Sequence, residues 1–392
     1  MERLICYISI LFSFVALSSC GDKDEPGPVL TETDRTVLVY MVADNSLGTW
    51  SCDDADIAEM LTAAKAGGLA GGRLVVYHGR PRTEINPPQL LDITPSGVVT
   101  LKTYPTATAD GDKIYSVDPA RIREVLSDTK TFAPAGEYAI VFWSHSSGWL
   151  GPVGKDDYRY RAFGDDRGHH ITIQTLASTL AGEKFSFIYF DCCQMANVES
   201  AYELRHLTPV IVGSPTELGI DGMRYDLNVP VFFSPVPDLE QAARNTYEDY
   251  AGNNLECQMT VIRTEGLERL ASATRDIMVR LEDYPEGVGS LQRYCRPTET
   301  CWSYDMKQYM ELITPQDSKE LLAEWEKAFD KVVTYAASTP TAIGGSALSP
   351  FYINTCNGLG MYVIKGPEEI SYRQYDSLAW WNDVVSVAPA YK

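Results

Sequence analysis

Apolar residues in this chain gather in short continuous runs rather than alternating with polar residues. Thr36–Ala43, Leu74–His78 and Tyr138–Trp143 are runs of this kind, rich in β-branched and aromatic side chains. A strand that is apolar at successive positions is buried on both faces, which is typical of a parallel sheet. Phe185–Phe190 and Pro209–Ser214 have the same pattern. Together these runs predict the strands of one buried sheet.

The segments between the runs have helical spacing of apolar positions. Acids in the first turn and Gly67 after the last turn mark one such segment, and Pro119 lies at a favoured first-turn position of another. The predicted helices are Asp53–Ala66, Asp118–Asp128, Ile173–Leu180 and Met195–His206. Strands that alternate with helices through short connections predict a doubly wound α/β fold, in which ligands bind at the carboxyl ends of the strands.

The rest of the chain departs from this alternation. The Pro-, Thr- and Gly-rich stretch Pro81–Asp112 contains VVTLKTY, which predicts an edge strand. The C-terminal part contains the strand-like runs QMTVIR and GLGMYVI and the predicted helices Leu239–Tyr250, Leu267–Leu281 and Ser318–Ala337. We therefore expect a core at residues 35–236 and a mainly helical extension at residues 237–392 that packs on it.

Residues 1–19 have the pattern of an export signal. Arg3 supplies a positive charge, and the apolar segment Leu4–Leu17 is too short to span a bilayer comfortably. LSSC, which ends at Cys20, resembles the bacterial lipobox, in which the cysteine carries the lipid; the alternative is an ordinary secretory signal. Residues 20–34 are acidic and rich in Pro and Gly, which predicts a flexible tether similar to the export signals of Bacteroidetes-type surface lipoproteins. We expect an exported protein, lipid-anchored to the cell envelope at the outer membrane or the cell surface.

The composition limits the classes of partner that we expect this protein to bind. The formal net charge of −20 over 392 residues excludes nucleic-acid binding, which needs positive charge. We expect contact with membranes through the lipid anchor only, and a monomer. Of the nine cysteines, Cys6 is removed with the signal and Cys20 carries the lipid, which leaves an odd number. Cys295 and Cys301 are close enough in sequence to be bridged, although two buried free thiols are equally consistent.

Two of the predicted strands end beside residues suited to nucleophilic catalysis. His145 follows one strand in WSHSSGW, and Cys193 follows another in FDCCQM. Because the carboxyl ends of parallel strands lie at one edge of a sheet, a thiol and an imidazole there suggest a cysteine hydrolase. A helix that begins near Met195 would lower the pKa of the Cys193 thiol. Either residue alone would more often be structural, so the pair carries the hypothesis.

Several segments resemble the clostripain family of cysteine peptidases, within the caspase-like clan. They are TVLVYMVADNSL, the strand-terminal His145 with Gly148 and Trp149, FDCCQMANVESAYELR and SPTELGIDGMRY, and they span about Thr36 to Tyr225. The resemblance implies a caspase-like α/β/α sandwich with a mostly parallel central sheet. It also implies an endopeptidase that cleaves after Arg or Lys through a thioester acyl-enzyme.

The resemblance assigns roles by position. Cys193 is the nucleophile and His145 the general acid and base. The backbone N–H groups of Cys193 and Ser146 are the expected oxyanion donors. Asp191 and Asp221 are the expected acids of the S1 pocket, which would bind a basic P1 side chain. For Asp221, a simple turn residue before a glycine is the alternative.

The chain also departs from the family pattern. Ser146 stands where the family has Gly, which would be strained if that position needs a positive φ. Cys192 stands where Ala is usual, and its alternatives are a small filler, a disulfide partner or a competing thiol. These departures leave a second hypothesis open, namely an inactive or weakened clostripain-like surface lipoprotein that binds peptides.

Processing and metal binding are further implications of the resemblance. Several members of the family mature by self-cleavage after a basic residue in the loop between the catalytic His and Cys. Here Lys155, Arg159 and Arg161 are the candidates, with the two arginines preferred, and a solvated basic loop without cleavage is the alternative. We expect no cofactor and no metal. Calcium is the alternative, because some members need it and because His169 and His170 lie close in sequence to Asp165 and Asp166.

Overall fold

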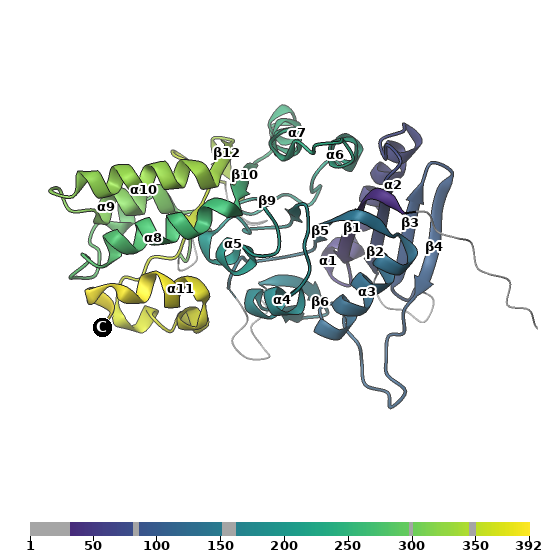
Figure 1. Ribbon diagram of the computed structural model, residues 1–392, viewed down its shortest axis with the longest axis horizontal. Coiled ribbons are helices and arrows are strands. Elements are labelled where there is room, and N and C mark those ends of the chain that lie inside the picture. Colours follow the sequence, from purple (N-terminus) through teal and green to yellow (C-terminus); the bar gives the residue numbers. More distant parts are fainter. Residues whose placement is uncertain (1–31, 81–85, 151–161, 298–300, 345–349) are drawn as a thin grey trace, which may run out of the picture. The chain divides into compact units, whose positions relative to one another are not determined.

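The computed structural model describes residues 32–80, 86–150, 162–297, 301–344 and 350–392. A nine-stranded sheet runs through the described part of the chain in the order β12-β10-β9-β8-β5-β1-β2-β3-β4 (Figure 1). Its strands are β1 (Thr33–Val42), β2 (Arg73–Gly79), β3 (Gln89–Thr94), β4 (Gly97–Thr103), β5 (Ala135–Trp143), β8 (Ile188–Asp191), β9 (Val210–Gly213), β10 (Gln258–Arg263) and β12 (Val333–Ser338).

Parallel pairing is confined to the middle of the sheet. β2, β1, β5, β8 and β9 pair in parallel, whereas β3, β4, β10 and β12 add antiparallel pairs at the two sides. The continuous apolar runs belong to the parallel strands, as their two-sided burial requires. β10 and β12 come from the C-terminal part of the chain, and Glu32–Lys392 form one compact unit.

Helices cover both faces of this sheet. They are α1 (Ser46–Thr49), α2 (Cys52–Lys65), α3 (Pro119–Phe132), α4 (Ile173–Thr179), α5 (Val198–Leu204), α6 (Tyr225–Phe232), α7 (Leu239–Gly252), α8 (Leu267–Met278), α9 (Met306–Ile313), α10 (Lys319–Val332) and α11 (Ala379–Asp383). Short strands outside the main sheet are β6 (Phe163–Asp166), β7 (His169–Ile171), β11 (Tyr304–Asp305), β13 (Thr341–Ala342), β14 (Phe351–Tyr352) and β15 (Gly360–Met361).

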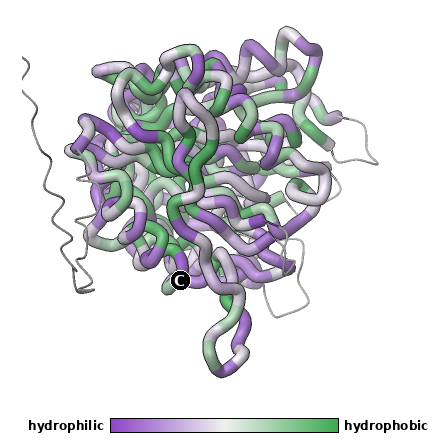
Figure 2. Tube along the Cα trace, turned by 90° about the vertical axis from the view of Figure 1, so that its right-hand side faces the viewer, coloured by the Kyte–Doolittle hydropathy of each residue, from purple (hydrophilic) through white to green (hydrophobic). Residues whose placement is uncertain are grey.

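The alternation of β1 side chains shows how the two layers of helices are held. Val37, Val39 and Met41 pack in one apolar core with residues of α2, α6 and α7. Leu38 and Tyr40 pack in the other core with residues of α3, α4 and α5. Hydrophilic positions gather on many of the outer turns of the chain trace (Figure 2). The fold is therefore the expected caspase-like α/β/α sandwich.

Three local predictions differ from the structure. The predicted helix Ser318–Ala337 ends at Val332, and β12 follows because its residues pair with β10. The predicted helix Met195–His206 begins only at Val198, where the Asn197 side chain accepts the N–H of Ser200 as a cap. The strand β3 was not predicted. VVTLKTY does form an edge strand, β4.

The described residues contain no helix that is both long and apolar enough to cross a membrane.

Candidate active site

His145 and Cys193 follow neighbouring parallel strands at the same edge of the sheet. Trp143 of β5 and Asp191 of β8 are register partners, and each candidate residue comes two positions later. The Ser146 hydroxyl donates a hydrogen bond to the carbonyl oxygen of Cys193, which ties the two loops together. The structure thus brings the predicted pair to one edge of the sheet.

The imidazole of His145 is held by a residue from a third strand end. Its Nε2 lies 2.8 Å from the hydroxyl oxygen of Ser46, the first residue of α1. Asn45 caps that helix and also donates to the carbonyl oxygen of Asp165 at 2.8 Å. Sequence reasoning missed Ser46, although its place at the carboxyl end of β1 was a usable signal.

The thiol of Cys193 faces the loop that follows β9. Its Sγ donates to the carbonyl oxygen of Leu218 at 3.7 Å, and the backbone N–H of Gln194 donates to the carbonyl oxygen of Thr216 at 2.7 Å. Gln194 has a φ of 60°, so the residue after the candidate nucleophile is in the left-handed region. Strained backbone of this kind is frequent at functional sites.

The structure favours the protonated thiol of Cys193 over the expected thiolate. Desolvation raises the pKa of Cys193 to about 12, and the negative charge of Glu217 adds to the shift. The prediction that a helix lowers this pKa was wrong, because α5 begins five residues after the cysteine and is capped by Asn197. Burial and the charge of Glu217 therefore favour the protonated form of the Cys193 thiol in this conformation.

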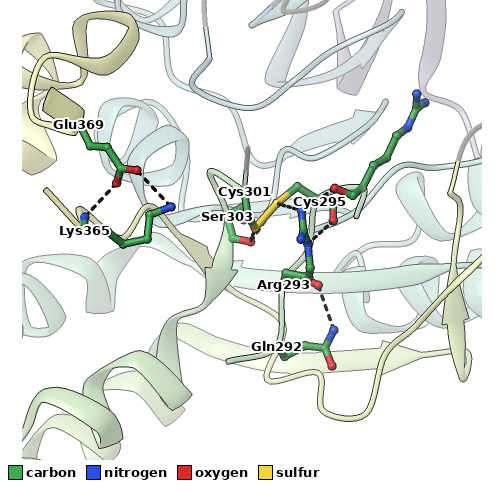
Figure 3. Close-up of a disulfide and its surroundings, with 8 residues drawn as sticks. Gln292, Arg293, Cys295, Cys301, Ser303, Lys365 and Glu369 are labelled. Carbon is green, nitrogen blue, oxygen red and sulfur yellow. Dashed lines mark hydrogen bonds and ion pairs between the residues drawn. A yellow bond between two sulfur atoms is a disulfide. The ribbon is translucent and has the colours of Figure 1, made fainter. Parts of the chain in front are cut away.

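One cation opposes this shift. The positive charge of Arg296 lowers the pKa of Cys193, and its guanidinium pairs with Glu217 at 2.5 Å. Arg296 follows Cys295, which forms a disulfide with Cys301. Figure 3 shows this disulfide beside Arg293, whose guanidinium donates to the carbonyl oxygen of Cys295 at 3.0 Å. The bridged alternative for this cysteine pair is therefore the one that the structure adopts.

The strain expected at Ser146 is absent. Ser146 is not among the described non-glycine residues with positive φ. The nearby left-handed position is Gly148, with a φ of 65°, where a Cβ would lie 2.6 Å from the Asn197 side-chain nitrogen. The glycine that this turn requires is thus present, and Ser146 instead contributes a hydroxyl contact.

Cys192 is a free, buried cysteine with a relative exposure of 3%. Burial raises its pKa well above the ordinary value. Cys192 is buried and free, whereas Cys193 is partly exposed, so these observations favour the filler interpretation over a competing thiol or a disulfide partner.

Asp191 points to the face of the sheet that α2, α6 and α7 cover. One carboxylate oxygen accepts the N–H of Met223 at 2.9 Å, and the other is buried. The Tyr225 hydroxyl also lies close to this carboxylate. Gly222 has a φ of 59°, and a Cβ there would lie 2.9 Å from Asp191 Oδ2. The glycine therefore lets the backbone close over the carboxylate. Burial raises the pKa of Asp191.

Asp221 lies directly before this glycine and is exposed. Its negative charge contributes to raising the pKa values of Cys52 and Tyr250, so its carboxylate lies near both α2 and α7. Asp191 is thus buried against Gly222, and Asp221 precedes this glycine at the surface.

Sequence reasoning missed a further carboxyl group at this place. Asp56 of α2 is 4% exposed, and its Oδ2 accepts the indole N–H of Trp143 at 2.6 Å. Burial raises the pKa of Asp56 above its ordinary range, and the nearby Asp191 charge raises it further. The acids of DDADIAEM indicated a helix start, and nothing local in that sequence distinguishes the one that faces the sheet.

The residues considered for calcium make local contacts in the β6–β7 hairpin. His170 Nδ1 lies 2.7 Å from the carbonyl oxygen of Gly164, and His169 stacks on Tyr115. Asp165 and Asp166 accept backbone N–H groups from Gly168 and Ser116. Cys20, Arg159 and Arg161 lie outside the described residues.

Comparisons with known proteins agree with this geometry. The clostripain family model matches residues 39–347. An inactive zymogen C11 protease from Parabacteroides distasonis is 26% identical, with a TM-score of 0.77 over 91% of this chain and 99% of that one. A secreted C11 cysteine protease from Bacteroides thetaiotaomicron, solved with an irreversible peptide inhibitor, is also 26% identical, with a TM-score of 0.74 over 90% and 99%. A search of curated proteins gave no match. The chain belongs to the clostripain family, a family of cysteine proteases.

Proposed function

We propose that this protein is a cysteine endopeptidase that cleaves after Arg or Lys with Cys193 as nucleophile and His145 as general acid and base. The observation that carries the proposal is the pairing of β5 with β8, because the two residues follow register partners at one sheet edge. Asp191 and Asp221 support a basic P1 residue, since a carboxylate pairs with guanidinium by charge-assisted hydrogen bonds.

The chemistry follows from the two groups. Cys193 loses its proton to His145, and the sulfur attacks the carbonyl carbon of the scissile bond. The backbone N–H groups of Cys193 and Ser146 would stabilise the oxyanion. The imidazolium then gives its proton to the leaving amine, which leaves a thioester. Water, activated by the neutral imidazole, hydrolyses the thioester and restores the thiol.

The resting contacts suggest that this machinery needs activation. The thiol donates to Leu218, and its raised pKa disfavours attack. One of the similar structures is of an inactive zymogen. We therefore propose maturation by cleavage after Arg159 or Arg161. The mass of the protein, before and after incubation, checks the cut. We also propose that the protein is exported and anchored by a lipid on Cys20; the secreted relative supports export, and the same mass measurement checks the lipid.

A fluorogenic peptide with Arg at P1 tests the assignment. Cys193→Ala is expected to abolish cleavage and Cys192→Ala to leave it largely intact. Activity that survives the first change but not the second would overturn the choice of nucleophile. We expect chelators to leave the activity unchanged; loss that calcium restores would show that the protease needs the ion.

The raised pKa of the thiol also favours a second candidate, a peptide-binding relative that has lost turnover. An Arg chloromethylketone separates the two, because it labels only a working thiolate. Labelling of Cys193 supports the peptidase. A matured protein that binds Arg peptides, resists the label and cleaves nothing would establish the binding protein.

A further inference from the structure

Two buried carboxyl groups share the space between the sheet and α2. Trp143 and Asp191 are register partners, and both lie on the face of the sheet that α2 covers. The Trp143 indole reaches away from the sheet to Asp56 Oδ2 at 2.6 Å. Asp56 and Asp191 are each 4% exposed. Trp143 therefore joins the strand that precedes His145 to the acid on the helix above it.

The groups around these acids are neutral donors rather than cations. Asp191 Oδ1 accepts the Met223 N–H at 2.9 Å, and its Oδ2 is buried. The buried Tyr225 hydroxyl lies close to Asp191, and hydrogen bonding from it lowers the pKa of that carboxyl group. Within the described residues, no ion pair includes Asp56 or Asp191. The nearby Arg224 is turned to other acids, at 3.3 Å from Glu59 and 2.6 Å from Asp226.

Two buried carboxylates without a cation are costly. Desolvation disfavours the charged form, and a like charge close by disfavours the second ionisation. The electrostatic cost of such a pair falls when one carboxyl group keeps its proton or when the pair binds a cation. The pKa values of Asp56 and Asp191 are both raised, with burial as the larger cause.

We propose that Asp56 is a specificity residue of the S1 pocket, and that a proton held between Asp56 and Asp191 is released when a cationic P1 side chain enters. The inference rests on the proposed cleavage after Arg or Lys. The exchange is balanced, since the carboxyl O–H breaks, its proton passes to solvent, and the guanidinium or ammonium group takes its place as counter-charge.

Other titratable groups lie around Asp56 and Asp191 and influence when this pair gains or loses a proton. From α2 they are Cys52, Asp53 and Glu59; from the sheet and the loop after β8, Tyr189, Cys192 and Cys193; from α6 and the turn before it, Asp221, Arg224 and Tyr225; and from α7, Tyr250. Asp53 pairs with His78 at 2.6 Å, and Glu59 with Arg224. Arg224 is thus engaged by outer acids, which leaves a P1 side chain as the counter-charge for the inner pair.

Calorimetry with benzamidine, a small cation that resembles a P1 side chain, tests the exchange. The matured protein is titrated in buffers of different ionisation enthalpy, which counts the protons released per ligand. We expect release of up to one proton near neutral pH, and an affinity that rises by up to about tenfold per pH unit while the release lasts. Neutral benzamide is the ligand control and should release none.

Variants on one helix locate the proton. Asp56→Asn keeps an oxygen for the Trp143 indole and is expected to remove most of the release. Asp54→Asn is the matched control, because Asp54 is exposed on the same helix at 3.7 Å from Arg80, and it should behave as wild type. Melting curves establish that both variants fold.

The outcomes separate this inference from the proposed specificity. Binding of benzamidine by the wild-type protein without proton release overturns the inference and leaves cleavage after Arg intact, whether or not a variant folds. Equal release from Asp56→Asn and wild type removes Asp56 from the exchange. If the folded, matured protein binds no benzamidine, both the inference and the proposed cation pocket are wrong.

Discussion

Ser46 Oγ lies 2.8 Å from His145 Nε2, although the two residues follow different strands of the sheet. β1 and β5 are parallel neighbours, so their carboxyl ends place α1 beside the turn that carries the imidazole. Cysteine peptidases work best when a third group orients the base. Ser46 is the candidate for that place here, as a positioning residue, since its hydroxyl contacts the imidazole of the proposed base.

Ser46→Ala is therefore expected to lower kcat by about three- to tenfold with little change in KM, because one hydrogen bond of about 1 kcal/mol no longer orients the imidazole. Steady-state kinetics with an Arg peptide and the pH profile of kcat measure the effect. Ser46→Thr keeps the hydroxyl and should rescue most of the rate. If the alanine variant retains full kcat and an unchanged pH profile, Ser46 has no such role.

The placement of the candidate pair His145 and Cys193 was predictable from sequence because it depends on strong local signals. The continuous apolar runs of β5 and β8 fix where each strand ends, and β-α alternation makes the strands parallel. His145 and Cys193 follow directly. The supporting residues were less accessible, since Ser46 and Asp56 are recognised only when separate segments pack together.

The wrong predictions for α5 and β12 have the same cause, because contacts between separate segments decide both conformations. The residues around Met195 are good helix formers, but the loop after β9 binds the backbone at Gln194 and Ala196 and delays α5 until Val198. The segment of β12 likewise follows a strong helix without a break, and pairing with β10 decides its conformation. Long-range hydrogen bonds override local propensity in both cases.

The Glu217–Arg296 pair is expected to tune the reactivity of Cys193. Glu217 raises the pKa of the thiol and Arg296 lowers it. Glu217→Gln removes a negative charge, so it should shift the onset of alkylation to lower pH, by about one unit for a charge in close range. Arg296→Met should shift it the opposite way. The measurement is the rate of iodoacetamide inactivation against pH.

Glu240→Gln is a suitable control for these variants, because Glu240 makes only a 4.0 Å pair with Arg263 on α7 and β10. Its alkylation profile should match that of the wild-type protein. Shifts of the same sign for Glu217→Gln and Arg296→Met would contradict the electrostatic argument and point to a change of loop conformation.

Gly222→Ala should weaken binding of basic substrates more than it slows the chemical step. A Cβ at this left-handed position would lie 2.9 Å from Asp191 Oδ2, so the turn has to move away from the carboxylate. We expect KM for Arg peptides to rise about tenfold, which corresponds to about 1.4 kcal/mol. Gly252→Ala, where a Cβ meets nothing within 4 Å, is the control. An unchanged KM would show that the turn plays no part in holding P1.

Asp56 should make the protein less stable as pH rises. Its pKa is raised in the folded state, so between the ordinary value near pH 4 and the raised value the unfolded chain is ionised while the native carboxyl keeps its proton. The native state then binds more protons, and the free energy of unfolding falls by up to about 1.4 kcal/mol per pH unit. Below pH 4 both states are protonated and the penalty disappears.

Glu199, whose pKa burial raises to about 7, acts in the same direction, so the comparison has to be made between variants. Asp56→Asn removes its own contribution and its repulsion of the nearby Asp191, and both changes should make its unfolding free energy relative to wild type rise between pH 5 and pH 8, as urea denaturation would measure. A difference that stays constant over this range would mean that Asp56 is already ionised in the native protein.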